Sequence, residues 1–137
     1  MLNATRIPHR LLALGLPLGP LQLLETVGRH SARRRTTPVV ILRAQGERWI
    51  VSPFGETDWV RNLRASRTAR LGRGARLRRV TLTDAPPELV PGLLRTYRRR
   101  YRLIPFVRAA FEPGATDDTD VYAEIAHRHP VFRVAPA

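Results

Sequence analysis

The arginine-rich segment GRHSARRRTTPV, residues 28–39, is the part of the sequence that most clearly points to chemistry. It places Arg29, Arg33, Arg34 and Arg35 within seven positions and then runs into an apolar stretch. Guanidinium groups form bidentate, charge-assisted hydrogen bonds to phosphate and carboxylate groups. The segment could therefore hold nucleic acid, a membrane headgroup, a phosphorylated cofactor or only water.

Side chains that could carry out catalysis unaided are few. The chain contains no cysteine, which excludes disulfides, thiolate nucleophiles and cysteine-ligated metals. Its four histidines, at positions 9, 30, 127 and 129, show no metal-ligand spacing backed by carboxylates, so no metal site is predicted. No G-x-S-x-G, P-loop or G-x-G-x-x-G motif occurs. If the protein is an enzyme, we expect a cofactor to carry the reaction while the protein holds and orients it.

Two further basic segments, residues 64–79 and 95–102, offer phosphate contacts of the kind that nucleic-acid-binding proteins use. Tyr97 and Tyr101 in the second segment could stack on bases. These tyrosines share an apolar helical face with Leu93, however, so the pattern favours core packing and makes a nucleic-acid partner the weaker interpretation.

Length and composition fit one domain of 137 residues with one core. All 24 basic residues are arginine, against 11 acidic residues, which gives a net charge of +13 and a field that attracts anions. The apolar stretch at 11–24 is interrupted by Pro17 and Pro20 and is too short to span a bilayer. We expect a cytoplasmic protein, with peripheral contact to a membrane left open as an alternative.

The elements that must position these residues are short. The pattern predicts a helical lead-in within residues 1–20, with a helix over 7–16, and further helices over 56–66 and 88–103. The helix over 56–66 would have Thr57 or Asp58 as its N-cap. Strands are predicted at 21–28, 39–42, 49–51 and 129–136, with a turn at residues 45–47 between the second and the third. A further hairpin is predicted around 72–74, with a bulge at Arg78–Arg79 because Leu77 is out of phase with the alternation of Val80 and Leu82. Residues 112–120 read as an acidic loop. Because no βαβ rhythm is present, we predict an α+β domain built on an antiparallel sheet or small barrel.

Three segments, LGPLQLLETVGRHSARRRTTPV, WIVSPFGETDWVRNLRAS and HPVFRV, resemble the deazaflavin-dependent nitroreductase family of actinobacteria in order and spacing. The resemblance implies an antiparallel split β-barrel with short flanking helices, related to the FMN-binding oxidases of the pyridoxamine-phosphate oxidase type. It also implies binding of the reduced deazaflavin coenzyme F420, a hydride donor with a phosphate and a polyglutamate tail. The implied reaction is hydride transfer to a small electron-poor acceptor such as a quinone or nitroaromatic.

The same resemblance assigns cofactor-binding residues. Arg29, Ser31 and Arg35 would hold the anionic tail, backbone groups of residues 51–55 would line the ring, and Trp59 and Asn62 would close the site. The full set is Gly28, Arg29, His30, Ser31, Arg35, Thr36, Thr37, Pro38, Val51, Ser52, Pro53, Phe54, Gly55, Trp59 and Asn62. His30 and Ala32 stand where the family often has Lys and Gly.

Several alternatives remain open at this point. Tyr97 is a candidate proton donor, against a packing role and against solvent as the proton source. The protein could instead be a non-catalytic cofactor carrier, an FMN-binding or haem-binding relative of the same fold, or a basic protein that binds nucleic acid or a membrane surface. Both a monomer and a homodimer are compatible with the sequence.

Overall fold

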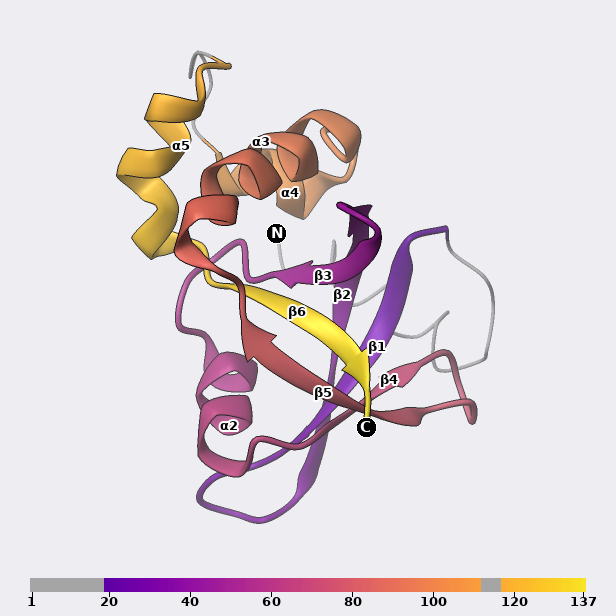
Figure 1. The fold of residues 1–137 in the computed structure, drawn as a ribbon. Coiled ribbons are helices and arrows are strands. Elements are labelled where there is room, and N and C mark those ends of the chain that lie inside the picture. The colour runs from indigo at the N-terminus through magenta and orange to yellow at the C-terminus, as the bar shows by residue number, and fades with distance from the viewer. Residues whose placement is uncertain (1–18, 112–116) are drawn as a thin grey trace.

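Six antiparallel strands close into a barrel in the computed structural model, which describes residues 19–111 and 117–137. Around the barrel the strands follow the order β1-β2-β3-β6-β5-β4, so the last strand of the chain lies between the third and the fifth (Figure 1). The strands are β1 (Leu21–Val27), β2 (Arg34–Ala44), β3 (Glu47–Val51), β4 (Ala69–Gly72), β5 (Arg78–Asp84) and β6 (Val131–Pro136). The prediction of a split β-barrel is confirmed.

Strand β2 is the longest and organises the barrel by pairing with two neighbours. Its first part pairs with β1, from Arg34 opposite Val27 to Val40 opposite Leu21, and its last four residues pair with β3. The tight turn to β3 uses Gln45 and Gly46, both with positive φ, as a two-residue hairpin with right-handed strand twist requires.

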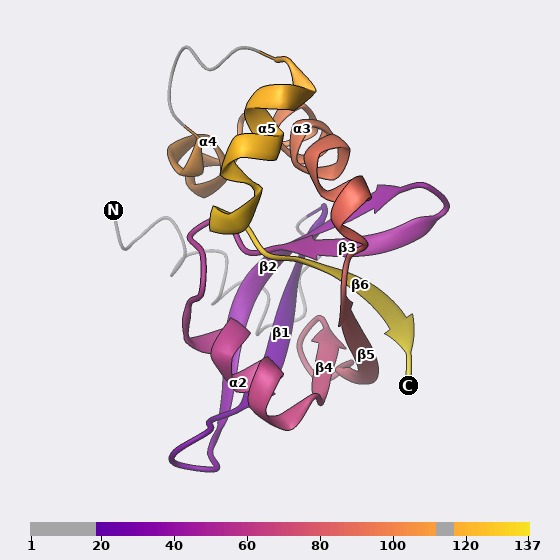
Figure 2. The same ribbon diagram turned by 60° about the vertical axis from the view of Figure 1, so that its left-hand side comes forward.

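Helices lie on two sides of the barrel. Helix α2 (Asp58–Ser66) connects β3 to β4, whereas α3 (Val90–Arg100), α4 (Pro105–Ala110) and α5 (Thr119–Ile125) gather together at the other end of the molecule (Figure 2). Single 3-10 turns, Pro87–Leu89 and Ala126–Arg128, precede α3 and β6. Within the described residues, no helix is both long and apolar enough to cross a membrane.

The buried side chains form two clusters. The barrel core contains Leu24, Ile50 and Phe132 from the strands, closed by Trp59 and Val60 of α2. The helix core lies between the strands and the three C-terminal helices. Its members are Val40, Leu42, Trp49, Val51, Ala85, Leu93, Leu94, Tyr97, Phe106, Val107, Phe111, Tyr122 and Val131. Together the clusters fix α2 on one side of β2 and β3, and α4 on the other.

Most predicted elements are confirmed, but the bulge is wrong. Arg78 and Arg79 pair one to one with Leu71 and Arg70. The bulge was predicted because Leu77 is out of phase with Val80 and Leu82. Leu77 lies in the connection between β4 and β5, before the strand begins, so it need not share the strand's alternation.

The C-terminal third differs most from expectation. The helix predicted over 88–103 is regular only from Val90 to Arg100, and its buried stripe of Leu93 and Tyr97 is confirmed. Two short helices, α4 and α5, were not predicted, and α5 begins inside the expected acidic loop with the Asp118 carboxylate accepting from the backbone N–H of Asp120. The helix predicted over 7–16 and residues 112–116 of that loop lie outside the described residues.

Candidate cofactor site

A cavity of about 640 Å³ opens where β2, the loop after β3, the start of α2 and helix α4 meet. Its lining is mainly apolar. The residues are Thr37, Pro38, Val39, Val40, Val51, Ser52, Pro53, Phe54, Thr57, Asp58, Trp59 and Phe106. The Phe54 side chain remains 56% exposed, which is unusual for a large aromatic group and leaves a ring free to contact a ligand.

Seven residues of the predicted site lie in this lining, namely Thr37, Pro38, Val51, Ser52, Pro53, Phe54 and Trp59. They come from two segments that line the same cavity, the middle of β2 and the connection from β3 to α2. The structure thus brings together residues 51–54, four of the five to which the resemblance assigned ring contacts, with Thr37, Pro38 and Trp59.

The loop between β3 and α2 is held by short internal hydrogen bonds. The Ser52 hydroxyl donates to the carbonyl oxygen of Gly55 at 2.6 Å, and the Ser52 N–H donates to the carbonyl of Pro130 at 2.8 Å. Gly55 adopts φ +85°, a conformation that a residue with a β-carbon rarely takes, so glycine is required at this turn. Gly55 shapes the loop without lining the cavity itself.

His129 supports the same loop through a hydrogen bond to its backbone. Its Nδ1 lies 2.7 Å from the carbonyl oxygen of Pro53, which requires Nδ1 to carry the proton and donate. The imidazole is buried and stacks on the Phe111 ring, with centroids 4.7 Å apart. Burial lowers the pKa of His129, against the opposing effect of the hydrogen bond to Pro53, and so favours the neutral ring.

The start of α2 lines the cavity and carries polar groups that have no partner among the described residues. Thr57 occupies the N-cap position, as predicted, but its hydroxyl does not cap the helix. Its Oγ1 is buried and has no hydrogen-bond partner among the described residues. The first N–H groups of a helix also have no intrahelical acceptor, and they carry partial positive charge. A ligand with polar oxygen or nitrogen atoms at this edge would satisfy them.

Arg29 lies beside this helix rather than free in solvent. Both its backbone N–H and its Nη1 donate to Oδ1 of Asn62, at 3.1 and 2.9 Å, and its Nη2 lies 3.4 Å from the Asp58 carboxylate. Asn62 is buried, and Arg29 keeps 26% of its side chain exposed. The structure therefore joins two predicted residues 33 positions apart and fixes a guanidinium group near the start of α2.

The turn that carries Arg29 is tightly built. The Gly28 N–H donates to the carbonyl of Arg33, and the Ala32 N–H donates to the carbonyl of Gly28. A β-carbon on Gly28 would lie 2.6 Å from the Ser31 hydroxyl and 3.2 Å from the carbonyl oxygen of Arg33. It would displace that hydroxyl from its hydrogen bond with the Arg33 N–H, so glycine fits this turn best. Ala32 has φ 58°, which explains why the family often has Gly at this position.

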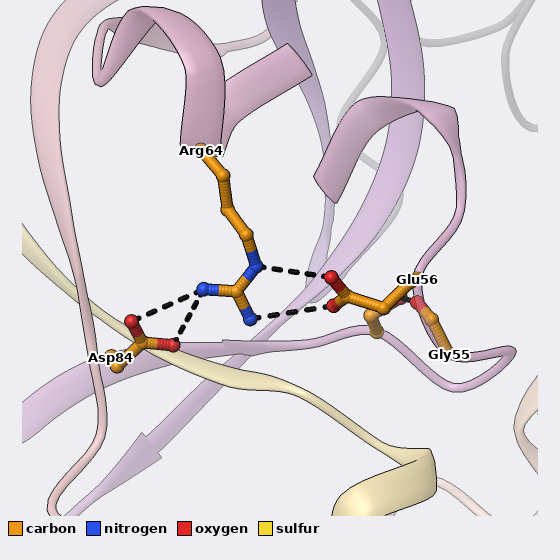
Figure 3. A network of polar contacts seen from close by, with 5 residues as sticks. Gly55, Glu56, Arg64 and Asp84 are labelled. Atoms are coloured by element: carbon orange, nitrogen blue, oxygen red, sulfur yellow. Dashed lines mark hydrogen bonds and ion pairs between the residues drawn. The ribbon is translucent and has the colours of Figure 1, made fainter. Parts of the chain in front are cut away.

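Arg64 fixes the other side of α2. Its guanidinium group donates to both oxygens of Glu56, just before the helix, and to both oxygens of Asp84, at the end of β5 (Figure 3). It also lies over the Phe132 ring, 5.2 Å from the centroid. The group is 40% exposed, so each pair contributes little stability, but the four-point geometry sets the position of the loop that carries Thr57.

The remaining predicted residues do not line the cavity. His30, Ser31, Arg35 and Thr36 are exposed on the turn after β1 and the start of β2. Tyr97 is completely buried in the helix core against Tyr101 and Phe111, and it is absent from the lining. Burial, and next the neighbouring Tyr101, raise the pKa of the Tyr97 hydroxyl well above its usual range.

Comparison with known proteins decides the family. Residues 9–102 match the family described as F420H(2)-dependent quinone reductase, and this match covers more than half of the chain. The chain belongs to this family. Its cofactor is coenzyme F420, and the class of activity is that of an oxidoreductase. No curated protein sequence matches the chain significantly.

Solved structures share the fold of this quinone reductase family member at low sequence identity. A structure described as an F420-H2 dependent reductase is 18% identical, with a TM-score of 0.53 over 85% of this chain and 94% of that one. A domain-swapped dimer is 17% identical, with a TM-score of 0.55 over 95% of each chain. A Listeria innocua protein classed with the pyridoxamine 5′-phosphate oxidases is 12% identical, with a TM-score of 0.52 over 95% of this chain and 93% of that one.

Sequence reasoning missed three residues of the site. Thr57 was noted only as a helix cap, and neither Phe106 nor His129 was assigned a role. Phe106 and His129 lie beyond residues 9–102, which match the family, and Phe106 also lies outside the three segments that carried the resemblance. A signal was present for both: His129 is the first residue of the segment HPVFRV, and Phe106 follows Ile104 and Pro105 at the start of a short apolar run.

Proposed function

We propose that this protein transfers a hydride from reduced coenzyme F420 to an electron-poor acceptor, with a quinone as the main substrate class. The observation that carries the proposal is the cavity at the start of α2, which combines aromatic walls with a buried Thr57 hydroxyl that has no partner among the described residues. When bound, the reduced deazaflavin supplies the hydride from C5 of its ring.

The cavity fits a flat, largely apolar ring with polar edges. Its volume is within the usual range for small-ligand sites. Trp59 and Phe106 provide apolar surface that excludes water from the reacting atoms, which strengthens the electrostatic interactions there. The Thr57 hydroxyl can donate to a carbonyl oxygen of the bound ring or accept from a ring N–H. Positioning of donor and acceptor in one water-poor cavity is the contribution we assign to the protein.

Arg29 is our candidate for the anionic part of the cofactor. Asn62 and Asp58 hold its guanidinium group in place, which reduces the conformational entropy lost when it binds phosphate or carboxylate. Arg29→Ala should cost about 2–3 kcal/mol of cofactor binding if the contact is charged and shielded from water. Arg99→Ala, on α3 and paired with Asp117, removes the same charge elsewhere and should cost much less.

Fluorescence titration with F420 tests cofactor choice and geometry together. We expect the protein to bind F420 more tightly than FMN, and more tightly than an F420 analogue without the glutamate tail. Thr57→Val, which keeps the shape but removes the hydroxyl, should weaken binding of both F420 forms by about tenfold, the cost of one buried hydrogen bond. Tighter binding of FMN, or equal affinity of the Thr57 variant, would contradict the proposed site.

Loss of reduced-F420 absorbance on mixing with a naphthoquinone tests the reaction. Nitroaromatics are the second acceptor class that we propose, and they can be compared in the same assay. An F420 complex that transfers no hydride to either acceptor would favour a non-catalytic cofactor carrier.

Assembly and location complete the proposal. The likeness to a domain-swapped dimer supports a homodimer over a monomer, which light scattering of the purified protein can decide. We also propose a cytoplasmic location. Peripheral contact with a membrane would appear as co-sedimentation with anionic lipid vesicles.

A further inference from the structure

A second cavity, of about 390 Å³, lies on the side of the barrel beside β1, β4 and β5. Four arginines from different elements line it, and we call it the arginine cavity. They are Arg34 at the start of β2, Arg67 after α2, Arg70 in β4 and Arg79 in β5. None of its lining residues belongs to the lining of the candidate cofactor cavity.

Among the residues that the structure describes, Glu25 is the only acidic side chain in this lining, and it is already paired. Arg70 donates through Nε to Oε1 at 2.8 Å and through Nη2 to Oε2 at 3.0 Å, which is a bidentate pair. The hydrogen bond from Arg70 lowers the pKa of Glu25, so the carboxylate is ionised and fully engaged. The pair also fixes the direction of the Arg70 guanidinium group.

The other three arginines form no salt bridge with a side-chain carboxylate among the described residues, although the charge of Arg34 helps to lower the pKa of Glu25. Arg34, Arg67 and Arg79 are exposed and converge on the cavity from three separate segments of the chain. Four guanidinium groups thus share the lining with one side-chain carboxylate, that of Glu25, and with Ala137, the last residue of the chain. Such an excess of positive charge in a concave site focuses the field and favours an anion with several negative groups.

Arg67 occupies a backbone position where glycine is the usual residue. It ends α2 with φ 59° and ψ 16°, and its N–H donates to the carbonyl of Leu63 at 2.7 Å. This left-handed conformation is usually taken by glycine, because a β-carbon is strained there. The chain therefore tolerates backbone strain at the residue that places a guanidinium group at the cavity, which is a pattern seen at functional sites.

We propose that the arginine cavity binds a compact polyanion that carries two or more phosphate or carboxylate groups. Planar guanidinium groups approaching from several directions match an anion with many oxygens better than a single charge. The cavity lies at the lower end of the size range of small-ligand sites, which favours a small molecule over a polymer. This site goes beyond the proposed reductase function and does not depend on it.

Isothermal titration of the full-length protein with pyrophosphate, without F420, tests the proposal. We expect one saturable site per chain whose affinity falls as ionic strength rises. Arg67→Gly should weaken binding by about tenfold or more, the loss of one charge-assisted contact, while the melting temperature stays the same or rises because glycine relieves the strain. Arg79→Gln provides a second variant and should also weaken binding.

The matched control is Arg61→Ala, which removes an exposed arginine of α2 that does not line the cavity. It should change the affinity by no more than about twofold, since only the general field is reduced. Equal losses in Arg61→Ala and Arg67→Gly, or the absence of saturable binding, would overturn the proposal.

Two competition arms exclude other occupants. Saturating F420 should leave pyrophosphate affinity unchanged, and displacement by F420 would overturn a separate site. A single-stranded oligonucleotide that binds more tightly than pyrophosphate, and loses affinity in Arg67→Gly, would also overturn the proposal in favour of a nucleic-acid surface. Failure of the F420 titrations alone would leave the arginine cavity unaffected.

Discussion

Replacing Tyr97 by phenylalanine should stabilise the protein. The Tyr97 ring is fully buried in the helix core, and its hydroxyl has no hydrogen-bond partner among the described residues. The ring contacts with Tyr101 and Phe111 do not require the oxygen and remain in the variant. The substitution therefore removes one desolvated polar atom and preserves the surrounding apolar packing.

The size of the effect follows from the cost of burying an unpaired hydroxyl. That cost is about 1–3 kcal/mol, and its removal is the gain expected for the variant. The gain is reduced by a few tenths of a kcal/mol, because the packing contacts of the hydroxyl oxygen are lost with it. For a domain of this size, a gain of about 1–2 kcal/mol in unfolding free energy corresponds to a rise of roughly 3–8 °C in melting temperature. Since Tyr97 does not line the cavity, the turnover number with F420 and a quinone should stay within about twofold of wild type.

Tyr101→Phe is the matched control, since it makes the same chemical change four residues further along. The Tyr101 hydroxyl donates to the carbonyl of Ile41 at 3.1 Å, so its loss should destabilise the protein by about 0.5–1.5 kcal/mol. Differential scanning fluorimetry and steady-state turnover measure both effects. An equal fall in melting temperature in both variants would refute the packing argument. A drop in turnover beyond about tenfold in Tyr97→Phe, with unchanged melting temperature, would instead identify Tyr97 as the proton donor.

Two further outcomes can be checked by the dependence of unfolding on pH and by paired glycine variants. Burial lowers the pKa of His129 in the folded protein, whereas histidine in the unfolded chain titrates at about 6.5. Protonation therefore favours the unfolded chain, and the free energy of unfolding should fall as the pH drops below that value. Urea unfolding between pH 5 and 8 should show this loss in wild type and a flatter profile in His129→Asn; identical profiles would contradict the assignment. Gly72→Ala should cost roughly 2 kcal/mol or more, because its β-carbon would lie 2.1 Å from the carbonyl oxygen of Arg76 at φ +159°. Gly92→Ala, in α3 with nothing near the added carbon, should stabilise by up to about 1 kcal/mol, and destabilisation there would mean that the helix is packed differently.

The sequence by itself determined the local elements. The turn at Gln45 and Gly46 sits between two β-branched and aromatic runs, and this hairpin forms as predicted. The stripe that contains Leu93 and Tyr97 has helical period and forms the buried face of α3. Both signals depend on residues a few positions apart, where backbone conformation and side-chain direction are set by neighbours along the chain.

The sequence also placed much of the candidate site, through motifs that lie close together. The segments around Pro38 and from Val51 to Trp59 line one cavity because β2 and β3 are hairpin partners and α2 follows β3 directly. The bulge predicted at Arg78–Arg79 does not form, which shows where prediction from side-chain alternation fails. Alternation predicts a face only within a strand, and the ladder with β4 decides where the strand begins.

Only the tertiary structure decided which distant residues complete the site. Barrel closure inserts β6 between β3 and β5, and this brings His129 against the carbonyl of Pro53, 76 positions earlier in the chain. The helix core places Phe106 in the cavity wall and removes Tyr97 from it. Arg29 likewise finds Asn62 only because α2 packs beside β1. These contacts depend on how whole elements pack, and no spacing along the sequence encodes that packing.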